Sequence, residues 1–292
     1  MLSAAIISPD RGSLPPDLLQ QLQEKISWNG IFYSSNYHAD NQTSLSPEII
    51  SMISDLLIIL DQEYCNFTFL SEAVRNGCHL FLTDKLQMTR NERHRLSELA
   101  DEGGTSIQIR NDLLFHPLRE RLNDDPTIPG FVEIHHYDPL LYGHFQENIF
   151  NNILITLRIA GTHIHRLNVF GSTSDEGKTD MVNIYLSFHN GSAASITLSA
   201  IGNKKEHRLA VHKNGQFLQI DFGNNHIKSV PQQRNTAVSR NTTDHPLAIQ
   251  LNDFIGRVST HSTPFFSLKD ETVAFHLLEK IKAKLETRAM VI

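Results

Sequence analysis

Lys85 lies between the end of a predicted strand and the start of a predicted helix. Residues 79–83 are largely apolar and are predicted to form a short buried strand, which delivers Asp84 and Lys85 at its carboxyl end. Thr89 is predicted to cap the next helix, and Glu92 three residues later completes a capping box. Ligands of open α/β sheets bind at the carboxyl ends of the strands. Lys85 is therefore a candidate catalytic acid or substrate anchor, and the alternative is a solvated lysine in a loop.

The N-terminal part of the chain alternates predicted strands and helices. Strands are expected at 2–7, 30–33, 55–60, 79–83 and 106–110, and helices at 14–26, 47–53, 68–75 and 89–103. Residues 56–60 of the run at 55–60 are all apolar, as is typical of a central strand in a parallel sheet. This alternation predicts a Rossmann-like α/β domain over residues 1–115.

The periodicity changes after residue 130. A long helix is expected at 143–160, extended runs at 131–137, 164–170, 181–188, 193–200, 207–213 and 217–222, and later helices at 246–259 and 272–288. Hairpin-type turns are predicted at 190–191, 202–203 and 214–215, and a polar loop at 229–244. The pattern predicts an α+β domain over residues 116–292, with an open, mostly antiparallel sheet.

Composition limits the classes of function. The 292 residues can bury a sizeable core, and the net charge of −6 argues against a general nucleic-acid or acidic-membrane binder. No apolar run approaches the roughly 18 residues of a membrane span. The chain has two cysteines and no signal-peptide pattern at its start, which suits a reducing, cytoplasmic location.

Several segments, in order along the chain, carry a family resemblance. The words NGCHLF and TDKL around Lys85 resemble the "aGkHVl.EKP" segment of the glucose–fructose oxidoreductase / inositol dehydrogenase (Gfo/Idh/MocA) family, with Asp84 and Leu86 in place of its glutamate and proline. The segments NDLLFHP at 111–117, FHNGSAASITLS at 188–199 and HKNGQFLQID at 212–221 match further family patterns. The resemblance implies an oxidoreductase that uses NAD or NADP on a sugar- or cyclitol-like alcohol.

The residues at the expected cofactor positions depart from the family. The glycines of the phosphate-binding turn would fall at Ser8, Asp10 and Ser13, and none is present. A carboxylate at Asp10 would repel a pyrophosphate. Asn36 closes the Ser-Ser-Asn segment that replaces the usual ribose-binding acid, and Asn66 occupies the approximate position of a family histidine.

The predicted helix at 143–160 would carry the remaining catalytic groups. Aligned on its flanking glycines, the family's aspartate, histidine and second aspartate fall on Glu147, Asn151 and Leu154. An asparagine amide does not titrate near neutral pH, so Asn151 cannot act as a general acid or base. Glu147 could replace the first aspartate, and His144, one turn earlier, could replace the histidine; a histidine near a helix start is more often a cap or surface residue.

Two functions remain open. In the first, the protein is an NAD(P)-dependent oxidoreductase in which Lys85 is the catalytic lysine and Glu147 and His144 assist. In the second, it is an inactive family member that serves as a ligand-binding or oligomeric scaffold. The family commonly oligomerises through its open sheet, so a homo-oligomer is expected, and its last helix can pack back on the first domain. No local motif among the 16 histidines supplies the three or four ligands of a metal site.

Overall fold

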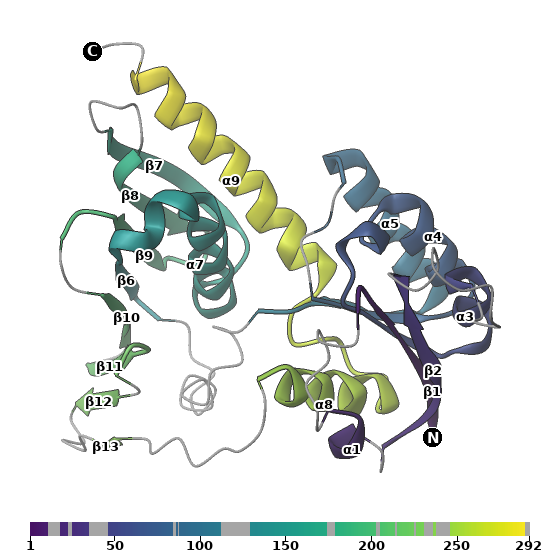
Figure 1. The fold of residues 1–292 in the computed structure, drawn as a ribbon. Helices are drawn as coiled ribbons and strands as arrows, with labels where there is room; N and C mark the ends of the chain where they lie inside the picture. Colours follow the sequence, from purple (N-terminus) through teal and green to yellow (C-terminus); the bar gives the residue numbers. More distant parts are fainter. Residues whose placement is uncertain are drawn as a thin grey trace. The chain divides into compact units, whose positions relative to one another are not determined.

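The computed structural model describes residues 1–10, 18–22, 25–34, 46–83, 86, 88–111, 129–173, 179–202, 205–213, 215–224, 226–230, 236–237 and 246–289. The chain divides into two compact units (Figure 1). The first unit contains residues 1–115 and 242–272, and the second contains residues 116–241 and 273–292.

The first unit is built on a five-stranded parallel sheet in the order β2-β1-β3-β4-β5. The strands are β1 (Leu2–Ser8), β2 (Ile26–Tyr33), β3 (Leu56–Ile59), β4 (His79–Leu82) and β5 (Ile107–Ile109). The predicted Rossmann-like sheet is therefore confirmed. The first helix was predicted to reach Ile26, which was wrong, because Ile26 pairs with Leu2 in the parallel ladder and is buried there. Pairing in the sheet decides the state of such a short apolar segment.

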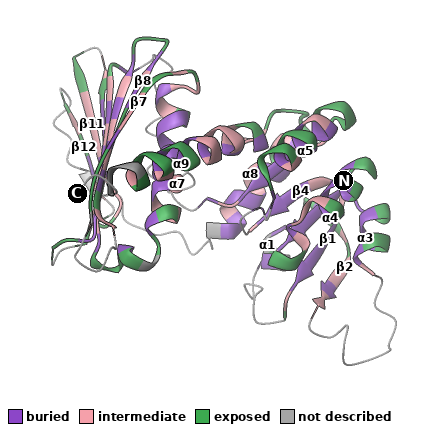
Figure 2. Ribbon diagram, turned by 90° about the horizontal axis from the view of Figure 1, so that it is seen from above, coloured by how far each residue is buried: buried purple, intermediate pink, exposed green. Residues whose placement is uncertain are grey.

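Helices cover both faces of this sheet (Figures 1 and 2). Helices α3 (Pro47–Ile53), α4 (Phe67–Arg75) and α5 (Arg90–Gly103) contribute to the core on one face, and α1 (Leu18–Leu22) and α8 (Pro246–Ser259) to the core on the other. Phe254 of α8 packs on Phe81 of β4, with 5.8 Å between ring centroids. The sequence analysis placed α8 with the second domain. It belongs to the first unit because its apolar side chains cover this sheet.

The ends of α5 follow the sequence signals. Thr89 and Glu92 form the predicted capping box, in which the Thr89 amide donates to Glu92 Oε2 at 2.7 Å. Gly104 ends the helix at φ 64°, a left-handed conformation that glycine adopts without a Cβ clash.

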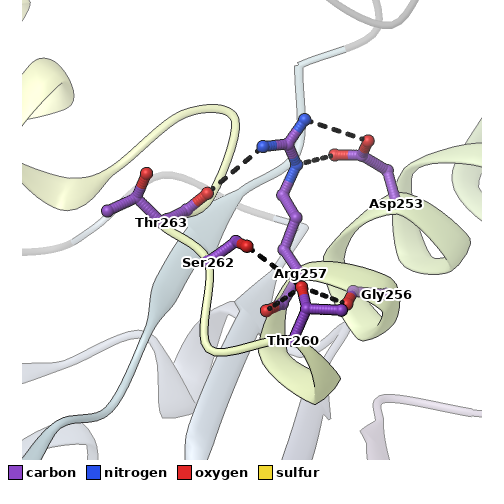
Figure 3. A network of polar contacts seen from close by, with 6 residues as sticks. All are labelled: Asp253, Gly256, Arg257, Thr260, Ser262 and Thr263. Atoms are coloured by element: carbon purple, nitrogen blue, oxygen red, sulfur yellow. Dashed lines mark hydrogen bonds and ion pairs between the residues drawn. The ribbon is translucent and has the colours of Figure 1, made fainter.

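Arg257 holds the turn that follows α8 (Figure 3). Its guanidinium donates to both carboxylate oxygens of Asp253, at 2.8 and 3.4 Å, and to the carbonyl of Thr263 at 3.3 Å. It also lies 5.6 Å from the centroid of the Phe265 ring. These contacts join the last turns of α8 to the segment that leads to α9 (Leu268–Ala289).

The second unit contains an eight-stranded sheet in the order β13-β12-β11-β10-β6-β9-β8-β7. The strands are β6 (Phe131–Tyr137), β7 (Ile164–Thr173), β8 (Thr179–Phe188), β9 (Ala193–Ser199), β10 (Glu206–Lys213), β11 (Gln216–Asp221), β12 (His226–Val230) and β13 (Thr236–Ala237). All neighbours pair antiparallel except β6 and β9, which confirms the mostly antiparallel sheet.

Two local expectations for this sheet were wrong. The turn at 202–203 was predicted to close a hairpin, but β6 lies between β9 and β10, so that connection crosses over a strand. The stretch 229–244 was predicted to be a loop, yet Ser229 and Val230 belong to β12, and 236–237 form β13. Ser229 and Val230 pair with Leu218 and Phe217, which supplies the backbone bonds that this polar segment lacks by itself.

Helix α7 (Phe145–Ala160) packs on one face of the second sheet, against β6 and β9. Alternate residues of β6, Val132, Ile134 and His136, are buried, and the intervening residues are more exposed. Within this unit Leu285 of α9 lies against Gly171 of β7. None of the helices in the described ranges combines the length and apolar character that a membrane span requires.

Candidate functional site

The carboxyl edge of the first sheet is where a Rossmann-like fold binds its ligand. The chain leaves β1 toward β2 on one side and returns to β3 on the other, so the carboxyl ends of β1 and β3 form the switch point of this sheet. Ser8 is the last residue of β1 and is fully buried. Its hydroxyl donates to the backbone carbonyl of Asp10 at 2.8 Å, and Asp10 itself is exposed.

A side-chain hydrogen bond spans the switch point. Ser34, directly after β2, donates its hydroxyl to the carboxylate of Asp61, which follows β3. Because β1 lies between β2 and β3, this bond crosses the carboxyl end of β1. The second carboxylate oxygen of Asp61 accepts from the Glu63 amide at 3.0 Å.

The described residues at this edge, which exclude 11–17, do not fit a dinucleotide pyrophosphate. The phosphate-binding turn needs backbone N–H groups and a close backbone approach. Here Pro9 has no amide hydrogen, Ser8 carries a side chain turned onto the backbone, and Asp61 brings a carboxylate to the same edge. Of the other predicted cofactor positions, Ser13 and Asn36 lie outside the described residues.

Asn66 has a structural role. Its Oδ1 accepts from the Phe69 amide at 3.1 Å, which caps α4, and its Nδ2 donates to the Glu63 carbonyl at 2.6 Å. The amide is thus used at both ends by backbone groups.

A buried arginine bonds to the backbone of Leu86 and Met88, which follow Lys85 in the sequence; Lys85 itself lies outside the described residues. Arg93 of α5 donates through Nη2 to the Leu86 carbonyl at 2.6 Å and through Nε to the Met88 carbonyl at 3.4 Å. Its Nη1 lies 2.9 Å from Oε1 of Glu271 in the first turn of α9. Burial raises the pKa of the Glu271 carboxyl to about 7, and the Arg93 charge opposes this rise.

Helix α7 brings two predicted catalytic residues together. Nδ1 of His144 lies 3.7 Å from Oε2 of Glu147 at the start of the helix, and both side chains are exposed. The carboxylate also suits the positive end of the helix dipole. Asn151 follows one turn after Glu147 and is partly exposed, whereas Leu154 is buried in the core.

Sequence reasoning missed a buried polar cluster on the same helix. Asn152 is fully buried and lies between two sheet histidines: its Nδ2 is 3.3 Å from Nδ1 of His136, and its Oδ1 is 2.9 Å from Nε2 of His207. Burial lowers the pKa of His136 to about 4, with Asp138 opposing and Lys205 adding to the fall. The signal was available, because alternation along β6 places His136 on the face of Val132 and Ile134.

Within the described residues, no group of three or more histidine, cysteine or acidic side chains could hold a metal ion. Both cysteines are buried thiols, and burial raises the pKa of the Cys78 thiol to about 12.

Comparisons with known proteins identify the fold. No family model and no curated protein matches the sequence. Among solved structures, UDP-N-acetylglucosamine 3-dehydrogenase GnnA from Acidithiobacillus ferrooxidans aligns with a TM-score of 0.78 at 16% identity, over 97% of each chain. The dehydrogenase MviM from Clostridium difficile aligns at 0.77 and 14% identity, over 97% of this chain and 99% of its own.

The structure of an NAD binding oxidoreductase from Klebsiella pneumoniae also aligns with this chain, with a TM-score of 0.76 at 11% identity, over 98% of this chain and 97% of its own. At these identities the likeness concerns the arrangement of the backbone. The chain therefore shares the two-domain fold of these three proteins.

Proposed function

We propose that this protein uses an oxidoreductase fold without hydride transfer and serves as a ligand-binding, self-associating scaffold. The observation that carries the proposal is Asn151 on α7, at the position where the resemblance implies the proton-transferring histidine. An amide neither takes up nor releases a proton near neutral pH. Leu154, at the position of the second acid, is buried among apolar residues.

The ligand that suits α7 is a small sugar-like molecule. His144, Glu147 and Asn151 lie within two turns of the helix and offer both donors and acceptors for hydroxyl groups. GnnA, by its name, acts on a nucleotide-linked amino sugar, which supports a sugar-like ligand here.

The second sheet offers a surface for self-association. On the face opposite α7, Phe170, Met181 and Tyr185 surround Asn183, and their side chains are 53%, 37% and 37% exposed. Exposed apolar side chains that are clustered in this way mark association surfaces. Both cysteines are buried thiols, which agrees with a protein that works in the reducing cytoplasm.

The test of this proposal measures turnover and ligand binding separately. The purified protein is mixed with NAD⁺ or NADP⁺ and a panel of sugars and polyols, and reduction is followed by nicotinamide absorbance. We expect no turnover, but saturable binding of a sugar-like ligand that is lost in Glu147→Gln and kept in the surface control Glu98→Gln. Turnover by the wild type would contradict the proposal.

Self-association is tested by light scattering after size exclusion. Tyr185→Asp should shift an oligomer toward the monomer, whereas Met52→Asp, at an exposed apolar side chain of the first unit, should not. A monomeric wild type, or an oligomer unaffected by Tyr185→Asp, would refute this part of the proposal.

The contact between His144 and Glu147 favours the second candidate, an active sugar-alcohol oxidoreductase. A histidine beside a carboxylate can exchange a proton with a substrate hydroxyl. If turnover is found, Lys85→Ala and His144→Gln should each reduce kcat by 10²-fold or more, a loss on the order of that for a general acid or base. Unchanged kcat in both variants would show that neither Lys85 nor His144 acts as a general acid or base.

A further inference from the structure

Asp61 and Ser34 close the switch point of the first sheet with the protein's own side chains. The serine hydroxyl donates to one carboxylate oxygen, and the Glu63 amide donates to the other at 3.0 Å. Two donors hold the Asp61 carboxylate in place. Asp61 is only 6% exposed, so water has little access to this carboxylate. The hydroxyl of Ser34 also lies 3.5 Å from the carbonyl of Ser8 at the end of β1.

The three residues that make these contacts lie at the carboxyl ends of three different strands. Ser8 ends β1, Ser34 follows β2, and Asp61 follows β3. The bond between Ser34 and Asp61 therefore runs across β1, over the place where an open α/β sheet receives a ligand. A fixed carboxylate there repels an anion strongly, because low exposure reduces solvent screening.

We infer that the Asp61–Ser34 bond is a built-in strap that closes this unit to phosphate-bearing ligands, including dinucleotides. The inference goes beyond the proposed function, which rests on the absence of a proton-transferring side chain at Asn151 of α7. The strap occupies the switch point with a negative charge and with satisfied hydrogen bonds, so a pyrophosphate would have to displace the bond and also meet the carboxylate.

The chain contains a matched control at the other end of the same sheet. Ser3 and Asp55 also form a serine–aspartate pair, in which the Ser3 hydroxyl and amide both lie 2.8 Å from Asp55 Oδ2. This pair links the amino ends of β1 and β3, far along the strands from the switch point. Asp55 and Asp61 flank the two ends of β3, so neutralising Asp55 removes one negative charge at the far end of this strand without opening the strap.

The test is calorimetry with ADP and with NADH on the full-length protein. We expect no saturable binding to the wild type up to millimolar ligand. Asp61→Asn should bind ADP at least tenfold more tightly than the wild type, since it removes the charge and keeps an acceptor for the Glu63 amide. Asp55→Asn should behave as the wild type.

The proposal is overturned if the wild type binds ADP or NADH with micromolar affinity, or if natively folded Asp61→Asn binds ADP no better than Asp55→Asn does. If Asp61→Asn fails to fold, Asp61→Ser, which keeps a polar group and removes the charge, takes its place. If a dinucleotide binds to the wild type without turnover, the inference about the strap is wrong but the proposed function still holds. The two proposals can therefore fail separately.

Discussion

The imidazole of His136 lies parallel to that of His207, with 4.0 Å between ring centroids and 3° between planes. Asn152 bonds to both rings, and its Nδ2 also donates to the Asn148 carbonyl at 2.8 Å. That last bond fixes which end of the amide is nitrogen. Nδ1 of His136 must therefore accept, and Nε2 of His207 must donate. Because its Nδ1 accepts, the His136 ring is a neutral imidazole within the core of the second unit.

The stability of the second unit should fall in mild acid. The pKa of His136 is lowered from 6.5 to about 4, so the folded state binds fewer protons than the unfolded state between these values. The stabilisation is fully present above pH 6.5 and is lost as the pH falls to 4. The loss is on the order of 3 kcal/mol.

Urea unfolding of the second unit between pH 7 and pH 4 measures this effect, together with NMR titration of the His136 ring. His136→Gln should weaken the pH dependence, whereas His163→Gln, at an exposed ring, should leave it unchanged. A His136 ring that titrates near pH 6.5 would contradict the prediction.

Asn152→Ala should destabilise the second unit by about 3 kcal/mol, because it removes the hydrogen bonds that the buried Asn152 amide makes to His136 and His207. Asn148→Ala is the control, since the backbone carbonyl that Asn152 uses is retained. Chemical denaturation of the two variants gives the comparison. Equal midpoints would show that the cluster contributes nothing to stability.

Arg93→Met should destabilise the first unit by about 3–5 kcal/mol, because Glu271 would remain buried without its counter-charge. The double variant Arg93→Met with Glu271→Leu should recover much of this loss. Lys269→Ala breaks an ion pair with Asp101 whose side chains are both largely exposed, so it should change the free energy of unfolding by less than about 1 kcal/mol. A similar cost for Arg93→Met and Lys269→Ala would refute the buried pair's importance.

Arg257→Lys should lower the free energy of unfolding of the first unit by about 1 kcal/mol, although the charge is kept. A lysine cannot donate to both oxygens of Asp253 and to the Thr263 carbonyl with the geometry of a guanidinium. Arg95→Lys, at an exposed pair with Glu98, is the matched control and should have no effect. The midpoint of thermal unfolding checks both.

Much of the fold could be predicted from local patterns. The apolar run before Asp61 and the capping box at Thr89 each identify an element without help from the rest of the chain. The order of these elements also predicts a parallel sheet followed by a mostly antiparallel one. Segments without a strong pattern of their own were misassigned, as at Ile26 and Val230, because their partners in the sheet decide their state.

The candidate site was less accessible from sequence. Ser8, Asp10, Ser13 and Asn151 can be read along the chain, and by the family resemblance they predict a changed cofactor turn and a changed catalytic helix. The bond between Ser34 and Asp61 joins residues 27 positions apart. No spacing rule predicts it, because it depends on β1 lying between the two strands that carry these residues.

The sequence by itself determined the class of each domain and the caps of α5, since these follow from residue type and short-range periodicity. The tertiary structure alone decided that α8 covers the first sheet, that Asn152 joins His136 and His207, and that Asp61 crosses the switch point. These features depend on contacts between distant segments, and such contacts form only when the sheets bring those segments together.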